Sequence, residues 1–308
     1  MNPILNLIRW PNLVVVVLMQ WLLYKYFIAK SFTGNHLQLD LGFNMAILFI
    51  AVTTLLTAGG YLINDLSDVK ADEINRPERI IVGRKLSVPV VKWLYFVSVA
   101  SGYVLSLYIS LRLGQPGLII YYLLFAIGLY LYSRYLKRLP LLGNLWVSAY
   151  CAGAIGMLWF AERHAYGELT IVAPEAAALL RSILLFFIVF AFLSTLFREL
   201  VKDMQDEQGD RAVGYRTAPV AWGFTITRYF AFATAFLLGI TIVVAGFGLQ
   251  TSWTNKLAPY WLGLVFMMLV LAGVLLAKAK TPGALRRVSL LIKAMMLGGI
   301  LWLLFIQV

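Results

Sequence analysis

Polar surface is what this 308-residue chain has least of. Charged residues make up 13% of the sequence, hydrophobic residues make up 61%, and the mean hydropathy is +0.83. So few polar side chains cannot cover a water-soluble globule of this size, and the solvent for most of the chain is predicted to be lipid. The single cysteine, Cys151, excludes an intrachain disulfide and is expected to be a small core residue.

Apolar runs long enough to cross a bilayer recur along the whole sequence. They are continuous rather than alternating, which favours helices over a β-barrel, because backbone groups in lipid must pair within their own segment. We therefore predict an all-α membrane protein that forms one domain over residues 1–308. The nine predicted helices cover residues 11–29, 43–63, 88–110, 117–133, 141–160, 178–198, 225–247, 258–277 and 287–307.

The first apolar run lacks a small-residue cleavage site and is long enough to span, so no cleavable signal is predicted and residue 1 is taken as the start of the mature protein.

The net charge of +12 could suggest nucleic acid, but the positions of the cations argue for a membrane topology instead. Eighteen of the 26 Lys and Arg residues lie at the N-terminus or after every second predicted helix. Cations of short loops stay on the cytoplasmic side, so these segments are predicted to face the cytoplasm, with the inner membrane as the expected location. His36 and His164 then fall on the external side, where neither can serve cytoplasmic chemistry.

Acidic residues number only 14, and ten of them lie in two short cytoplasmic segments after the second and sixth predicted helices. In each segment three aspartates have the spacing i, i+3, i+7. On a helix this spacing keeps three carboxylates within an arc of roughly 60° along about 10 Å. The two triplets are Asp65, Asp68 and Asp72, and Asp203, Asp206 and Asp210. Pro77 and Gly209 predict nearby helix ends, so Asp72 and Asp210 are expected to lie already in irregular backbone.

Crowded carboxylates repel one another, and a bound cation is the usual compensation. Oxygen ligands without nearby histidine or cysteine suit Mg²⁺ or Ca²⁺ rather than zinc. Mg²⁺ takes one or two carboxylates together with phosphate oxygens, so two acidic faces around a cavity would fit a diphosphate. A helix-loop-helix Ca²⁺ site is excluded, because its bidentate glutamate and its glycine are missing. Cations suited to phosphate lie nearby, namely Arg76, Arg79, Lys137, Lys202 and Arg211.

Two longer strings containing these aspartates resemble motifs of the UbiA superfamily of intramembrane prenyltransferases. They are NDLSDVKADEINRPER, from Asn64 to Arg79, and KDMQDEQGDRAVGYRT, from Lys202 to Thr217. Arg9, Pro11 and Asn12, and the stretch YSRYLKRLPLLGN at 132–144, add to the similarity.

The resemblance implies nine helices around a cavity open to lipid, with a prenyl diphosphate near the cytoplasmic mouth. It implies Mg²⁺ held by two sets of residues: Asn64, Asp65, Asp68 and Asp72, and Asp203, Asp206 and Asp210. Asp65, Asp68, Asp203 and Asp206 are the expected catalytic residues. The substrate-binding residues expected for the diphosphate or for an acceptor phosphate are Asn12, Asn64, Arg79, Lys137, Lys202 and Arg211.

The acceptor is predicted from the second motif, RELVKDMQDEQGDRAVGYRTAPVAWG at 198–223. It looks most like the branch that transfers a geranylgeranyl group to geranylgeranylglyceryl phosphate, an amphipathic acceptor. Enzymes with aromatic acceptors of the quinone or chlorophyll type share parts of this string and remain the alternative. A transporter is a third reading. Transporters usually carry their ionisable residues near the bilayer midplane, whereas these acids lie at helix ends.

Overall fold

The computed structural model describes residues 2–249 and 255–306, apart from the side chain of Arg79. The chain is 86% helical, and no strand occurs in these residues, so the predicted all-α class is confirmed. Besides the helices there are one isolated bridge, Val82 with Leu86, and short π and 3₁₀ turns. The α-helices are α1 (Pro3–Leu7), α2 (Trp10–Leu22), α3 (Ala29–Thr33), α4 (Gly42–Asn75), α5 (Val88–Leu113), α6 (Gly117–Arg134), α7 (Leu142–Ala161), α8 (Arg163–Val172), α9 (Pro174–Ala212), α10 (Ala218–Trp222), α11 (Phe224–Gly248), α12 (Ala258–Lys278) and α13 (Pro282–Leu301).

Nine helical segments within the described ranges are long and apolar enough to cross a membrane, as the hydropathy pattern predicts. The first joins α2 and α3 through the π-helical turn Leu23–Ile28, and the last continues from α13 into the 3₁₀ turn Trp302–Phe305. Two spans are longer than a bilayer requires, since α4 has 34 residues and α9 has 39. Their extra turns carry the two aspartate triplets.

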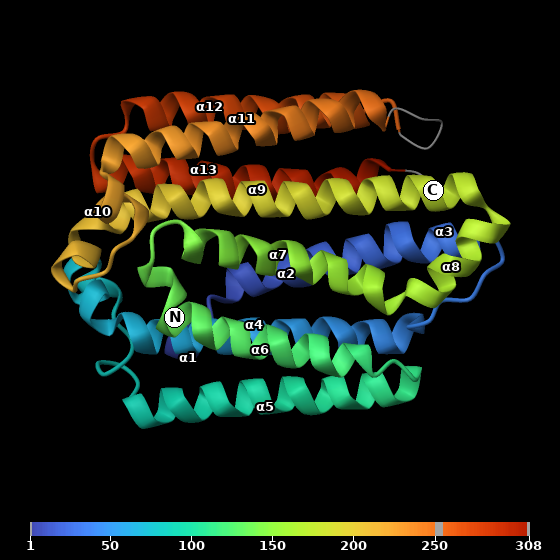
Figure 1. Cartoon of the computed structure of the whole chain (residues 1–308), viewed down its shortest axis with the longest axis horizontal. Coiled ribbons are helices and arrows are strands. Elements are labelled where there is room, and N and C mark those ends of the chain that lie inside the picture. The colour runs from blue at the N-terminus through green and yellow to red at the C-terminus, as the bar shows by residue number, and fades with distance from the viewer. Residues whose placement is uncertain (1, 250–254, 307–308) are drawn as a thin grey trace.

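The spanning helices lie side by side, with α9 near the middle of the bundle (Figure 1). Helices α11, α12 and α13 lie on one side of α9, and α2, α4, α5, α6 and α7 lie on the other. The N-terminus, the turn after α4 and the short helix α10 lie together at one end, while α8 lies at the opposite end. Both aspartate triplets therefore belong to the N-terminal end of the bundle.

The expectation that Asp72 and Asp210 lie in irregular backbone is wrong. Helix α4 continues to Asn75 and α9 continues to Ala212, so both aspartates are helical. Gly209 serves close packing rather than helix termination, because a Cβ there would come within 2.3 Å of the Asn75 amide. That amide accepts a hydrogen bond from the backbone N–H of Gly209 (2.9 Å) and donates one to the carbonyl of Asp206 (3.0 Å). The contact joins the polar ends of α4 and α9.

Candidate active site

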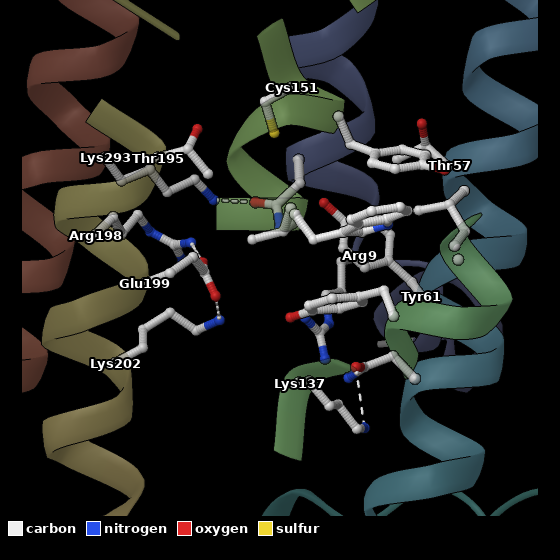
Figure 2. Close-up of a pocket in the computed structure, with 18 of the residues that line it drawn as sticks. Arg9, Thr57, Tyr61, Lys137, Cys151, Thr195, Arg198, Glu199, Lys202 and Lys293 are labelled. Atoms are coloured by element: carbon white, nitrogen blue, oxygen red, sulfur yellow. Dashed lines mark hydrogen bonds and ion pairs between the residues drawn. The ribbon is translucent and has the colours of Figure 1, made fainter. Parts of the chain in front are cut away.

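A cavity of about 360 Å³ lies inside the bundle and contains most of the residues that the sequence singled out (Figure 2). Its walls come from α2, α4, α6, α7, α9 and α13, so segments far apart in the sequence meet here. Its volume is in the range of pockets that hold a small organic ligand. Five of the six predicted aspartates line it: Asp68, Asp72, Asp203, Asp206 and Asp210.

The α4 wall of the cavity holds its carboxylates through basic and amide partners. Lys137 donates to the carboxylate of Asp68 and also to the side-chain oxygen of Asn64, at 3.2 Å. The Asn64 amide donates to the same aspartate at 2.8 Å. Asp65 is placed differently, because it lies outside the lining and accepts a 2.7 Å hydrogen bond from Arg9. Asp65 is thus positioned to hold Arg9, which does line the cavity.

On the α9 wall each aspartate also has a partner from another part of the chain. Asp203 accepts a hydrogen bond from the Asn144 amide at 2.9 Å. Asp206 forms an ion pair with Arg76, with a 2.6 Å contact to Oδ2. Asp210 accepts a 3.1 Å hydrogen bond from the hydroxyl of Thr217.

The other predicted binding residues fall into two groups. Asn12 and Lys202 line the cavity, where Asn12 accepts from Lys293 at 2.5 Å and Lys202 pairs with Glu199 at 2.8 Å. Arg211 does not line it. The guanidinium of Arg211 pairs at 2.6 Å with Glu207, one helical turn earlier on the surface of α9, and 61% of this arginine side chain is exposed. The structure thus corrects the placement of Arg211 at the mouth. The side chain of Arg79 lies outside the described residues.

Nearby carboxylates and burial shift the pKa of two side chains at the mouth, Arg9 and Tyr215, which lie outside the membrane-spanning segments. Burial lowers the pKa of Arg9, but the Asp65 carboxylate, together with Tyr61 and Asp68, raises this pKa above its usual value, so Arg9 stays charged. Burial raises the pKa of the Tyr215 phenol, and the nearby Asp68 carboxylate raises it further. Tyr215 is therefore a neutral hydroxyl, which donates to the carbonyl of Ser67 at 3.2 Å, and the Arg138 guanidinium lies 4.8 Å from the centre of its ring.

The remainder of the cavity is apolar and aromatic. Phe125 and Tyr150 form a tilted pair with ring centres 4.5 Å apart, and Phe187 and Phe190 line the wall formed by α9. Cys151 lies on the same surface, exposed to the cavity (Figure 2), so the prediction of a core position for it is wrong. One cavity thus joins a polar mouth to an aromatic interior.

The aspartates offer only oxygen donors, which suits Mg²⁺ in chemical type. They do not gather by themselves: among the described residues, no three His, Cys, Asp or Glu side chains are close enough to hold an ion. Mg²⁺ commonly takes only one or two carboxylates and completes its shell with phosphate oxygens and water. Carboxylates spread over two facing helices fit an ion that arrives with a diphosphate better than an ion held by protein alone.

Several residues in or beside the cavity were missed by sequence reasoning. Asn144 and Thr217 lie inside the quoted strings, but their partners Asp203 and Asp210 become apparent only when α7 and the segment after α9 are in place. Arg198 and Lys293 also line the cavity. A signal for Lys293 was available, because an ionisable residue within a membrane-spanning run usually has a function.

The described residues form a bundle with nine helices able to span a membrane, and its cavity has a polar mouth and an aromatic interior. These features define a class of membrane proteins suited to amphipathic substrates. The model of the UbiA prenyltransferase family matches residues 27–295, so the chain belongs to this family and is an integral membrane protein. The predicted resemblance is confirmed.

Curated relatives include digeranylgeranylglyceryl phosphate synthases from archaea. The protein of Thermococcus gammatolerans is 34% identical over 65% of this chain and 64% of its own length. That of Methanothermobacter thermautotrophicus is 29% identical over 95% of this chain and 92% of its own length. The chain thus spans slightly less than two thirds of the length of the first of these relatives.

Solved structures that share the fold include two with a known relation to this family. A structure of a digeranylgeranylglyceryl phosphate synthase superposes with a TM-score of 0.65 at 21% identity, over 98% of this chain and 97% of the other. A UbiA homologue from Archaeoglobus fulgidus, bound to GPP and Mg²⁺, gives a TM-score of 0.55 at 15% identity, over 98% and 99%. At these identities the likeness establishes the fold alone.

Proposed function

We propose that this protein transfers a geranylgeranyl group from its diphosphate to geranylgeranylglyceryl phosphate, with Mg²⁺ as the metal. The observation that carries the proposal is the single cavity in which aspartates of α4 and α9 meet basic residues at one end and aromatic rings at the other. A diphosphate needs the first environment, and a long prenyl chain needs the second.

The reaction requires one bond to break and one to form. The bond between the allylic carbon and the diphosphate oxygen breaks, the acceptor hydroxyl oxygen bonds to that carbon, and the hydroxyl releases its proton. Bound Mg²⁺ supplies stabilisation of the departing diphosphate charge. Asp68 and Asp206, with Asp72, Asp203 and Asp210, are the proposed ligands, while aromatic faces such as Phe125 and Tyr150 can stabilise a developing allylic cation.

The existing ion pairs indicate what the chain does when substrate binds. Lys137 pairs with Asp68, and Arg76 pairs with Asp206, so each aspartate already holds a cation. Asp68 and Asp206 would hold Mg²⁺, and Lys137 and Arg76 would then be free to bind the diphosphate oxygens, for which an ammonium and a guanidinium are both suitable. Asn64, hydrogen-bonded to Lys137 and Asp68, would keep both oriented.

The acceptor is proposed from the curated relatives and from the number of basic residues in the cavity. Its lining contains six acidic residues, the five aspartates and Glu199, and six basic ones: Arg9, Arg76, Lys137, Arg198, Lys202 and Lys293. With the aspartates engaged by Mg²⁺, the positive charge of these six residues would be left for anionic groups of the substrates. A diphosphate and an acceptor phosphate together would use that charge. An aromatic acceptor would leave much of it unused.

The proposal also covers the orientation of the protein in the membrane and its organisation as one domain. We place the N-terminus and the mouth of the cavity in the cytoplasm, because the cation-rich loops lie at that end. The inner membrane of the cell is the proposed location. Residues 1–308 are proposed to act as one domain.

The test is an assay of the purified protein with geranylgeranyl diphosphate, Mg²⁺ and one acceptor at a time. Geranylgeranylglyceryl phosphate is expected to yield an ether product, while 4-hydroxybenzoate and homogentisate are expected to yield none. Because diphosphates do not cross membranes, sealed inside-out vesicles should be active and sealed right-side-out vesicles should not. Product from aromatic acceptors alone would refute the acceptor, and activity confined to right-side-out vesicles would refute the orientation.

A further inference from the structure

Three cations lie close together on the wall formed by α9 and α13, next to the aspartates of α9. Arg198 and Lys202 come from α9, and Lys293 comes from α13 (Figure 2). Arg198 precedes Asp203 by five residues, so its backbone is about 7 Å further along the helix, towards the interior of the bundle. This cluster is thus adjacent to the aspartates but distinct from them.

Two cations of the cluster, Arg198 and Lys293, carry more positive charge than their ion-pair partners neutralise. Its acidic partner is the buried Glu199, which accepts from Arg198 at 2.9 Å and from Lys202 at 2.8 Å. Lys293 has no ion pair among the described residues, and its hydrogen-bond partner is the neutral amide of Asn12, at 2.5 Å. Lys202 also lies near the carboxylates of Asp203 and Asp206. Within the described residues, Arg198 thus shares one ion-pair partner with Lys202, and Lys293 has none, inside a largely apolar cavity. Uncompensated charge in such surroundings is costly, which favours binding of an anion.

Arg198 has unused hydrogen-bonding capacity in addition to its charge. Its Nε is buried and has no hydrogen-bond partner, while one terminal nitrogen is held by Glu199. A guanidinium held in this way keeps a fixed orientation, and its fork matches the oxygens of a phosphate. Lys293 is likewise fixed by Asn12. The two side chains lie near one another on one wall, opposite Arg9, Tyr61 and Lys137 (Figure 2).

We propose that Arg198 and Lys293 form a second anion subsite, which binds the phosphate of the acceptor while the aspartate faces hold the prenyl diphosphate. This inference rests on the proposed function and assigns its acceptor specificity to two residues. Asn12 is the positioning residue of the subsite, since it holds Lys293. Two separate anion sites keep two negatively charged substrates in one cavity without placing their charges on the same ligands.

The experiment measures binding of geranylgeranylglyceryl phosphate to the purified full-length protein by calorimetry, without Mg²⁺ or prenyl diphosphate. Lys293→Met and Arg198→Gln each remove one charge from the subsite, and Glu199 keeps Lys202 as partner in the second variant. Each variant is expected to weaken this binding about ten- to a hundredfold, the effect of one lost charge-assisted hydrogen bond. Lys293→Arg should restore most of it. Lys278→Met, at an exposed lysine of α12 outside the cavity, is the matched control and should bind like the wild type.

Two further measurements distinguish a phosphate subsite from a general loss of affinity in the cavity. Geranylgeranylglycerol, which lacks the phosphate, should bind the wild type and both variants equally, and the KM for geranylgeranyl diphosphate should change less than about threefold. Unchanged acceptor affinity in both variants, or an equal loss for both substrates, would overturn the subsite and leave the proposed function standing. A wild type that neither binds nor prenylates geranylgeranylglyceryl phosphate would overturn both.

Discussion

Chelation of divalent cations is expected to abolish turnover of the purified protein. A diphosphate is a poor leaving group unless its developing charge is neutralised, and metal ions supply on the order of 4 kcal/mol of such stabilisation, or about a thousandfold in rate. Added Mg²⁺ or Mn²⁺ should restore the rate of ether formation after EDTA treatment. Zn²⁺ should not, because the aspartates of the mouth offer no nitrogen or sulfur ligand.

The control for the chelation experiment is a measurement of whether the protein stays folded in EDTA. The protein should keep its melting temperature in EDTA, since the aspartates already have partners within the chain: Arg9 for Asp65, Lys137 for Asp68 and Arg76 for Asp206. Full activity in EDTA, or activity restored by Zn²⁺ alone, would contradict the proposed metal chemistry.

Asp68→Asn and Asp206→Asn are each expected to lower kcat about a hundred- to a thousandfold. These substitutions preserve shape but remove the charge that would hold Mg²⁺ against the diphosphate, and the loss of one preorganised electrostatic group at a reacting centre has this magnitude. The measurement is the steady-state rate with saturating Mg²⁺ and both substrates.

A matched control is available on α4. Glu73→Gln removes a carboxylate from the same polar stretch, but Glu73 is exposed and does not line the cavity, so its rate should equal that of the wild type. Expression and melting temperature should be similar in all three variants. Loss of folding in Asp68→Asn and Asp206→Asn, rather than loss of rate, would indicate that the aspartates are structural salt-bridge partners.

The fold could be predicted because few backbone conformations can cross a lipid bilayer. Each continuous apolar run must satisfy its own backbone, so hydropathy predicts nine helices, and the described part of the chain has nine that could span. The lengths of α4 and α9 were underestimated, since hydropathy detects only the part of a helix that lies in lipid. The residues beyond lipid are held by a contact between Asn75 and Gly209, which are far apart in the sequence.

The candidate site was predictable where the signal was local. The repeated i, i+3, i+7 spacing identified the aspartates from the sequence. The partners of those aspartates depend on how the helices pack, since Arg9 contacts Asp65 and Asn144 contacts Asp203. Arg211 could have been excluded from the sequence, because Glu207 stands four residues earlier, the spacing of a surface ion pair.

The most direct test of the proposed chemistry is an experimental structure with Mg²⁺ and an uncleavable thio analogue of geranylgeranyl diphosphate. We expect metal ions between Asp68 on α4 and Asp206 on α9, bridged by the diphosphate, with the prenyl chain running along Phe125 and Tyr150. Lys137 and Arg76 should have left their aspartates for phosphate oxygens. A diphosphate bound elsewhere, or metal ions that touch neither aspartate, would contradict the proposed role of the cavity.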